Sequence, residues 1–239
     1  MGAVTHPRFA PRRGSRPMPW WSKAWSRAVE EAAYHQDELR TGRALARRGA
    51  VGSITVGSGS LVAAVTEGDD AWTVQVTVPV LGEEAIAILV ELVAAESGRI
   101  AELAAGQLPH QLIEDAEDSG VELLPYGSEL AAECSCQAWA QPCVHGLAVL
   151  TQFTWLIDDD PFQLLLLRGL AKETLLARLH RRSVAAAGPS ADAGAAGEGV
   201  EGEAGDGVGA DVDTAYDAAV RAARILQVIE SGGDPDHLF

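Results

Sequence analysis

All three cysteines of the 239-residue chain lie in one twelve-residue segment, CSCQAWAQPCVH, which spans residues 134–145. The segment ends in a histidine, so its donors follow the pattern Cys-x-Cys, six residues, Cys-x-His. A structural zinc ion takes four such sulfur and nitrogen donors in a tetrahedron. Alternate residues of an extended chain project to the same side, so each pair of donors can face one ion. The spacing predicts a closed metal site made by Cys134, Cys136, Cys143 and His145.

Besides holding a metal ion, cysteines gathered in this way could have three roles. Cysteine often behaves as a small buried hydrophobe, but core residues would be scattered rather than gathered in a polar, turn-like stretch. A redox thiol pair is the next alternative, although a disulfide between Cys134 and Cys136 would be badly strained and three cysteines cannot all pair. A catalytic pair of Cys143 and His145 lacks a visible third partner. We adopt one structural zinc ion (Zn2+) as the prediction, because four protein donors leave no open position for catalysis.

Charge is divided unevenly along the chain. Residues 1–50 carry ten Lys or Arg against four Asp or Glu, whereas residues 51–239 carry eight against thirty. The acidic remainder should repel nucleic acid at long range, and the N-terminal fifth has the opposite sign. The sequence has no unbroken apolar stretch of about 20 residues and no apolar segment typical of a secretory signal near its start. We therefore expect no membrane association and a cytoplasmic location.

Periodicity and composition predict an α+β fold with a small antiparallel β-sheet, several helices and an embedded zinc finger. Four regions are expected: a disordered basic tail at 1–18, a domain at 19–182 with the finger at about 130–157, an acidic Gly/Ala-rich linker at 183–213, and a C-terminal helix and tail at 214–239. Strands are expected near 51–56, 60–66 and 72–78, with a brief strand at 121–126. Helical spacing covers 20–39, 82–109 (one helix or a pair), 109–120, 146–158 and 158–182.

Several blocks of the sequence resemble one known family. The pattern CxCx(n)CxH is the signature of the SWIM zinc finger, and here it reads CxCx6CxH. The blocks PWWSKAWSRAVE, GRALARRGAV, LAAGQLP, CSCQAWAQPCVHGLAVL and DDDPFQLLLLRGL look like successive blocks of the bacterial SWIM zinc finger proteins of actinobacteria, over about residues 19–180. One departure is the QAW that follows Cys136, where a Pro-Asp-like pair is expected before the tryptophan. The four ligand positions are intact.

The resemblance implies a binding function rather than an enzymatic one. SWIM domains are regarded as DNA-binding or protein-interaction modules, and the bacterial proteins tend to be associated with helicase-like ATPases of the Snf type. This sequence has no GxxxxGK[ST] loop, so a partner would have to supply ATP hydrolysis. We expect a non-enzymatic accessory factor that binds DNA, protein or both, with no small-molecule substrate. The alternative is a protein-interaction scaffold that never contacts nucleic acid.

A basic run before the first predicted strand offers candidate phosphate contacts. The candidate nucleic-acid-binding residues are Lys23, Arg40, Arg43, Arg47 and Arg48. The competing interpretation is a solvated helix face that balances the acidic remainder of the chain. The sequence favours neither of the two.

For the aromatic and acidic clusters we favour structural roles over functional ones. Trp21 and Trp25 are four residues apart, which is typical of a buried helix stripe rather than of a platform for stacking bases. Trp139 lies between the two ligand pairs, and we expect it to cover the metal rather than to form a recognition tip. Residues Asp158–Asp160 stop one helix and start another, so we expect helix capping rather than a cation site.

Overall fold

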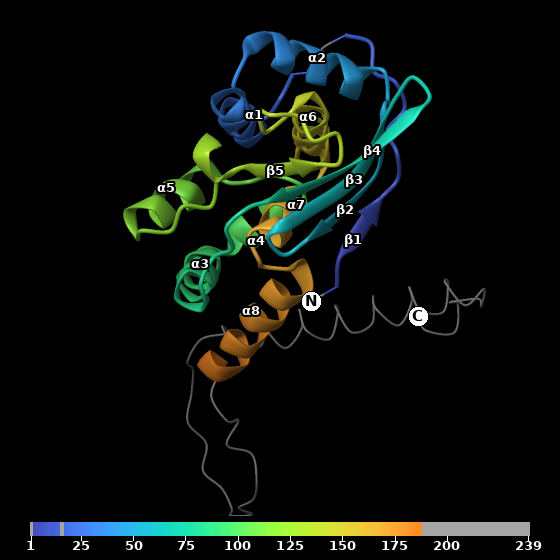
Figure 1. Ribbon diagram of the computed structural model, residues 1–239. Coiled ribbons are helices and arrows are strands. Elements are labelled where there is room, and N and C mark those ends of the chain that lie inside the picture. Colours follow the sequence, from blue (N-terminus) through green and yellow to red (C-terminus); the bar gives the residue numbers. More distant parts are fainter. Residues whose placement is uncertain (1, 15–16, 188–239) are drawn as a thin grey trace, which may run out of the picture. The chain divides into compact units, whose positions relative to one another are not determined.

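A five-stranded antiparallel sheet organises the residues that the computed structural model describes, 2–14 and 17–187 (Figure 1). Its strands follow the chain order β1-β2-β3-β4-β5. They are β1 (Val4–His6), β2 (Val51–Gly57), β3 (Ser60–Glu67), β4 (Asp70–Thr77) and β5 (Ala131–Cys134). The α+β class and the antiparallel sheet with several helices are confirmed. The predicted C-terminal helix at 214–239 and most of the predicted linker lie outside the described residues.

The central meander β2-β3-β4 matches the three predicted strands to within about two residues at each end. Two-residue turns join the strands, because Gly57 pairs with Ser60 and Glu67 pairs with Asp70. Each turn contains a glycine at positive φ, which is the conformation that tight hairpin turns require. The second of these turns brings Glu67 close to His145, in the Cys/His segment 134–145.

Two strands were not predicted from the sequence, and one predicted strand is wrong. Residues 4–6 were expected in a disordered tail but form β1, where Thr5 pairs with Thr55 and His6 Nε2 lies 2.8 Å from Gln163 Oε1. The expectation of disorder does not hold for these residues, because a pre-existing sheet edge and a distant side chain order them. Residues 121–126 form no strand, and the fifth strand begins at Ala131 instead.

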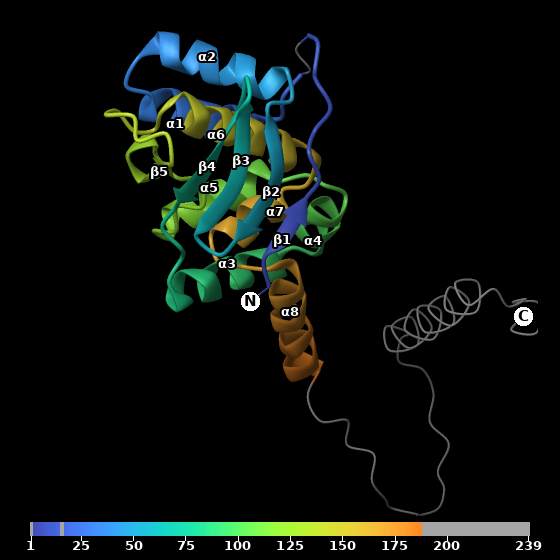
Figure 2. The same cartoon turned by 45° about the vertical axis from the view of Figure 1, so that its right-hand side comes forward.

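Three helices cover one face of the sheet: α1 (Trp20–Ala32), α2 (Gln36–Arg47) and α6 (Val144–Asp159). The single helix predicted over 20–39 is wrong, because extended backbone at Ala33 ends α1 before α2 begins. Helix α6 lies between the sheet and the pair α1 and α2, as Figures 1 and 2 show. Eleven of the sixteen residues of α6 are buried, as expected for a helix that packs between a sheet and other helices.

The tryptophans of α1 belong to the core, as their spacing predicted. Trp25 is fully buried, packs edge-to-face on Phe153 with ring centroids 4.8 Å apart, and donates Nε1–H to the Leu150 carbonyl oxygen at 3.2 Å. Trp21 is also buried, and its Nε1–H donates to the Ile157 carbonyl oxygen at 2.8 Å. Both rings therefore anchor α1 to α6, the helix that begins in the Cys/His segment 134–145.

Six further helical segments complete the described part of the chain. They are α3 (Glu83–Ala95), α4 (Ser97–Ala104), α5 (His110–Asp118), the 3-10 turn η1 (Gly127–Glu129), α7 (Phe162–Leu167) and α8 (Lys172–Ala187). The capping role expected at Asp160 is confirmed, since its carboxylate accepts the Phe162 backbone N–H at 2.9 Å and the Gln163 side-chain N–H at 2.8 Å. In the described part of the chain, no helix combines the length and the apolar character needed to cross a bilayer.

Candidate metal centre

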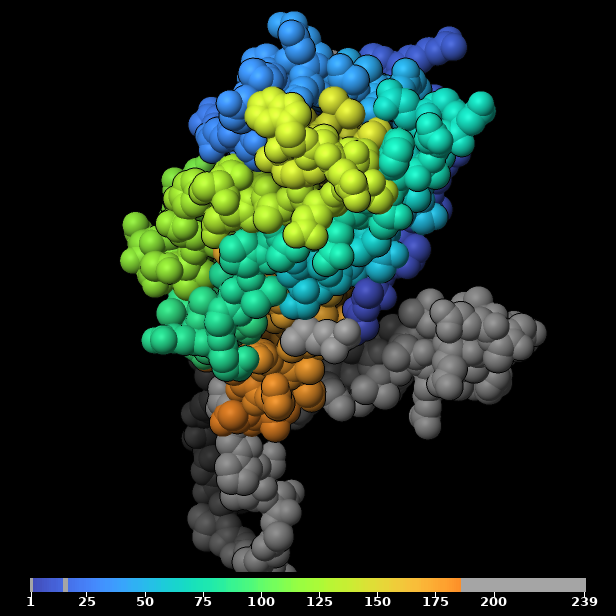
Figure 3. All heavy atoms as spheres, in the orientation of Figure 1, coloured from blue at the N-terminus to red at the C-terminus, as the bar shows by residue number. Residues whose placement is uncertain are grey.

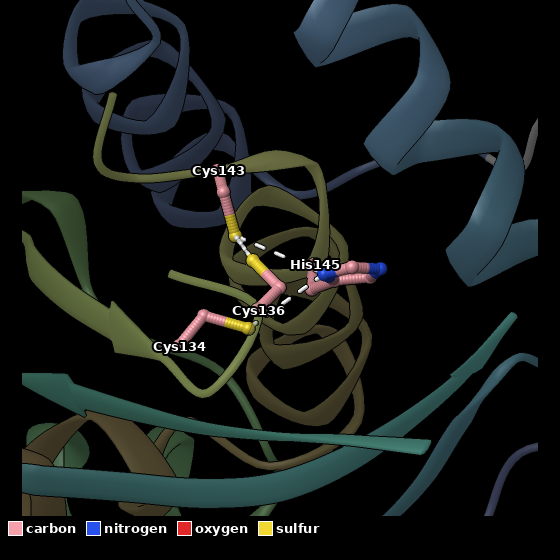
Figure 4. A group of neighbouring side chains, drawn as sticks. All are labelled: Cys134, Cys136, Cys143 and His145. Atoms are coloured by element: carbon pink, nitrogen blue, oxygen red, sulfur yellow. Dashed lines mark hydrogen bonds between the residues drawn. The ribbon is translucent and has the colours of Figure 1, made fainter. Parts of the chain in front are cut away.

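The structure brings the four predicted ligands together at one point. Cys134 ends β5, Cys136 lies in the following turn, Cys143 immediately precedes α6 and His145 is in the first turn of α6. Their donor atoms all lie within 4.8 Å of one another, and Figure 4 shows the side chains converging. In the described part of the chain, this group of four could hold one metal ion.

Three of the separations between donor atoms are close to those expected around a tetrahedral ion. The Sγ atoms of Cys136 and Cys143 are 3.5 Å apart, and His145 Nδ1 lies 3.6 Å from Cys134 Sγ and 3.9 Å from Cys143 Sγ. A tetrahedral zinc ion with ordinary bond lengths separates two sulfurs by about 3.8 Å and a sulfur from a nitrogen by about 3.5 Å. The donor set and these separations are therefore compatible with one tetrahedrally coordinated metal ion.

The edge of the sheet fixes the first pair of ligands. Cys134 pairs with Val74 of β4, and the next residue exchanges two hydrogen bonds with Thr73: the Ser135 N–H donates to the Thr73 carbonyl at 3.0 Å, and Ser135 Oγ accepts the Thr73 N–H at 2.9 Å. Gln137 then adopts φ +51°, the left-handed conformation that reverses the chain. The Gln137 N–H donates to the Cys134 carbonyl oxygen at 3.2 Å, and the turn that this bond closes contains Cys136.

The start of α6 fixes the second pair. The Cys143 N–H donates to Oε1 of Gln141 at 3.2 Å, and the Cys143 carbonyl accepts the first bond of the helix, from the Leu147 N–H at 2.9 Å. Gly146 approaches β5 so closely that a Cβ added there would lie 3.2 Å from Cβ of Ala132. The helix therefore starts against the strand that carries Cys134, which places His145 beside the sulfurs.

The three thiols have different pKa values in the absence of a metal. Burial raises the pKa of Cys134 to about 12 and also raises the pKa of Cys143. Burial opposes ionisation of Cys136 as well, but hydrogen bonds from the Ala138 backbone N–H and from His145, Cys134 and Cys143 outweigh it and lower its pKa to about 7. Thiols must lose their protons to coordinate a metal ion, and the charge of the bound ion favours that loss. A metal ion at this site would therefore convert all three thiols to thiolates.

A carboxylate from the β3–β4 hairpin contacts the ring nitrogen of His145 that faces away from the sulfurs. His145 is 4% exposed, and its Nε2 lies 3.1 Å from Oε2 of Glu67, at the end of β3. The Trp72 ring stacks on the imidazole, with centroids 5.8 Å apart and planes inclined by 29°. A carboxylate on the second ring nitrogen of a metal-binding histidine fixes its tautomer and orientation. Glu67 thus leaves Nδ1 to face the sulfurs.

Sequence reasoning missed both Glu67 and Trp72. Glu67 directly precedes the two-residue turn of the β3–β4 hairpin, and Trp72 follows that turn within β4. Glu67 is 78 residues from His145 along the chain. No local pattern marks such a contact. The hairpin itself was predicted, but its position next to the Cys/His segment 134–145 depends on the packing of α6 against the sheet.

Trp139 does not cover the metal site, so the cap expected from the sequence is wrong. Its side chain is 79% exposed, because the loop between the two ligand pairs points outward. The ring meets Tyr34, itself 63% exposed, in an edge-to-face contact with centroids 5.2 Å apart. In Figure 3 the loop (yellow-green) reaches the surface between the N-terminal helices (blue) and the β3–β4 hairpin (cyan). We call Tyr34 and Trp139 the aromatic pair.

The predicted nucleic-acid-binding residues fall on two helices. Lys23 is on α1; Arg40, Arg43 and Arg47 share one side of α2 by their spacing, and Arg48 follows it. Carboxylates already engage three of the arginines. Arg40 pairs with Asp37 at 2.7 Å, Arg43 with Glu30 at 2.5 Å, and Arg48 Nη2 lies 3.9 Å from Oε1 of Glu67.

Comparison with known proteins found a similar chain in Mycobacterium tuberculosis. This is the uncharacterized protein Rv2102, which is 32% identical over 183 residues that cover 75% of the present chain. The alignment spans 65% of Rv2102, so the chain matches a little under two thirds of that protein's length. No family model matches the chain. No solved structure matches it either.

Proposed function

We propose that the four-residue cluster binds one structural zinc ion in a SWIM-type finger, and that the protein is a non-enzymatic binding module. The observation that carries this proposal is the convergence of three sulfurs and His145 Nδ1 to within 4.8 Å, with Glu67 behind the imidazole. Three cysteines and one histidine are a common structural zinc set, and all four positions would be filled by protein. Such an ion would hold the two arms of the loop rigidly.

The loop would present a recognition surface. Its aromatic pair is exposed next to a point of the fold that the ion would fix. Large exposed rings contribute strongly to contacts with partner proteins, and they can also stack on unpaired bases. The aromatic pair therefore supports contact with another macromolecule.

The proposed role is that of an accessory factor to a helicase-like, Snf-type ATPase, through DNA contacts, protein contacts or both. The sequence blocks that resemble bacterial SWIM proteins and the basic first 50 residues support this role. Phosphate contacts would come from Lys23, Arg40, Arg43, Arg47 and Arg48.

One observation favours the alternative, a scaffold that contacts protein alone. Arg40 and Arg43 are paired with Asp37 and Glu30, and Arg48 lies near Glu67. Each of these ion pairs would have to loosen before its arginine could hold a phosphate. The aromatic pair, by contrast, needs no such rearrangement to contact a protein.

A salt titration of DNA binding separates the two functions. If the arginines contact phosphates, affinity for a labelled duplex falls steeply with salt, and replacement of Arg43, Arg47 and Arg48 by alanine reduces the log–log slope by roughly 0.9 per lost contact. The matched control replaces Arg178, Arg181 and Arg182 of α8, which removes the same charge elsewhere. No binding at low salt, or an equal loss in both triple variants, rejects specific DNA contact and leaves the scaffold. Copurification of a Snf-type ATPase after nuclease treatment would support the accessory role.

A further inference from the structure

A cavity of about 480 Å³ lies among the N-terminal segment, α1, α2 and α6, and its lining is rich in arginine. The N-terminal segment contributes Arg12 and Arg13, and α2 contributes Arg43 and Arg47. Figure 2 shows this segment running from β1 toward the level of α2. None of the four zinc ligands lines the cavity, so it is separate from the metal centre.

The cavity concentrates positive charge in a chain whose net charge is −16. Among the described residues, the lining includes four arginines and two acidic residues, Glu30 and Asp158, which is a formal excess of two positive charges. Glu30 is paired with Arg43. A hollow lined by one sign of charge focuses the electrostatic potential and raises the local concentration of oppositely charged ligands. The excess of positive charge in the lining therefore favours the binding of an anion in this cavity.

Specific contacts hold Arg12 and the segment around it in place. The Arg12 backbone N–H donates to the Arg47 carbonyl oxygen at 2.8 Å, and the Arg12 guanidinium lies 4.4 Å from the centroid of the Trp155 ring. A guanidinium that stacks on a ring by its face keeps the N–H donors at its edge. Arg8 ties the same segment to α2's end, since its Nε–H donates to the Gly49 carbonyl oxygen at 2.7 Å. The segment is therefore fitted to the cavity wall.

A hydroxyl group in the lining lacks a partner. Thr151 of α6 lines the cavity, and its Oγ1 is buried with no hydrogen-bond partner among the residues that the structure describes. A buried hydroxyl without a partner is unfavourable, and such groups are rare in native structures. An oxygen atom of a bound ligand would provide the missing hydrogen bond.

We propose that this cavity binds a phosphate monoester, carried either by a nucleotide-sized small molecule or by the end of a nucleic-acid strand. Arginine pairs well with phosphate because its planar fork matches two phosphate oxygens. The volume lies within the roughly 300–1,000 Å³ range of small-ligand sites. The site is separate from the zinc finger, but it shares Arg43 and Arg47 with the proposed contacts to duplex DNA.

Calorimetric titration of the full-length, metal-loaded protein with adenosine 5′-monophosphate, at low salt, tests the site. Saturable one-to-one binding is expected, with competition by inorganic phosphate and no binding of adenosine. Arg47→Ala should weaken binding about tenfold or more, the loss typical of a charged hydrogen bond. Arg40→Ala removes the same charge from the same helix but outside the cavity, and it should change binding by less than about twofold.

A second variant guards against misfolding of the first. Thr151→Val removes the unpartnered hydroxyl at nearly constant volume, so it should leave the unfolding temperature unchanged or raised while it weakens nucleotide binding. A single-stranded oligonucleotide with a 5′-phosphate, compared with its 5′-hydroxyl form, identifies the source of the phosphate. Tighter binding of the phosphorylated strand than of the mononucleotide assigns the site to strand ends.

Two results would overturn the proposal. One is the lack of phosphate-dependent, saturable binding for the mononucleotide, inorganic phosphate and the phosphorylated strand alike. The other is an equal loss of binding in the Arg40 and Arg47 variants, which would mean general charge attraction. Neither result bears on the zinc site, which is tested by metal analysis. Duplex binding shares Arg43 and Arg47 with this cavity and is tested separately, by the salt dependence of affinity for a duplex.

Discussion

The Nε2 atom of His145 lies 3.1 Å from Oε2 of Glu67, and this contact joins the candidate metal centre to the β3–β4 hairpin. His145 is buried, whereas the Glu67 side chain is about half exposed at 46%. Because Glu67 contacts Nε2, it is Nδ1 that faces the sulfurs, and Glu67 lies outside the Cys/His segment. The orientation of the imidazole should depend on the hairpin as much as on α6.

Removal of this carboxylate should weaken metal binding without removing a ligand. Glu67→Ala is expected to lower zinc affinity by about 10- to 100-fold, the usual cost of losing a partner of this kind. Glu67→Gln, which keeps an oxygen acceptor, should fall between this variant and the wild type. Competition with a chromogenic chelator measures the affinities. Glu133→Ala removes an exposed carboxylate next to Cys134 and serves as the control; equal affinity in the Glu67 and Glu133 alanine variants would contradict the role of Glu67.

Loss of one sulfur ligand should loosen a defined part of the fold. Cys143→Ala is expected to lose bound metal and to speed amide hydrogen exchange in the segment 134–150, because metal binding and local folding are linked. Exchange in β2 and β3 should change far less. Trp139→Ala is the matched control, since Trp139 lies in the same loop but is exposed. Normal protection of 134–150 in the Cys143 variant would show that the segment folds without a metal.

The crossing of α2 and α6 should tolerate no added methyl group at Gly42. A Cβ there would lie 2.8 Å from Cβ of Leu147 and 2.9 Å from the Val144 carbonyl oxygen, so the helices would have to separate. Gly42→Ala is expected to lower the free energy of unfolding by about 1–3 kcal/mol, as overpacking does. Gly98→Ala in α4 meets no atom within 4 Å and should be neutral or stabilising by up to about 1 kcal/mol. Denaturant titration of both variants measures the difference, and equal stabilities would rule out the close crossing.

Acid should destabilise the protein partly through Asp115. Hydrogen bonds from Gln111 and from the buried Arg99 lower the pKa of this carboxyl below its ordinary value of 3.8. A pKa lower in the folded than in the unfolded state means stabilisation that is present above the unfolded value and lost as the pH falls through the folded one. Asp115→Asn should therefore lower the unfolding temperature at about pH 6 and flatten its decline toward about pH 3. Asp118→Asn, on the same helix, should keep the wild-type profile; identical profiles for both variants would contradict the assignment.

The parts of the fold that the sequence predicted are those that local periodicity encodes. Alternation and glycine turns place β2, β3 and β4, and four-residue spacing marks Trp21 and Trp25 as core residues. The ligand cluster is also local, because all four donors lie within twelve residues. The four donors are brought together by the turn after β5 and by the start of α6, both of which lie within the same short segment.

The parts that could not be predicted depend on contacts between distant segments. Strand β1 lies in a basic stretch and is ordered by β2 and by Gln163, 157 residues from His6. The break between α1 and α2 contains neither proline nor glycine, so no residue type marks it. Trp139 is exposed, and it contacts Tyr34, which lies at this break. In each case tertiary packing decides what the local sequence leaves open.

The metal content of the purified protein tests the central claim most directly. Elemental analysis and native mass spectrometry of protein prepared without chelator should give about one zinc ion per chain, and none in Cys143→Ala. Removal of the ion should increase hydrogen exchange in 134–150. Protein that carries no metal after preparation in zinc-containing medium, and that protects 134–150 equally with and without added zinc, would contradict the account.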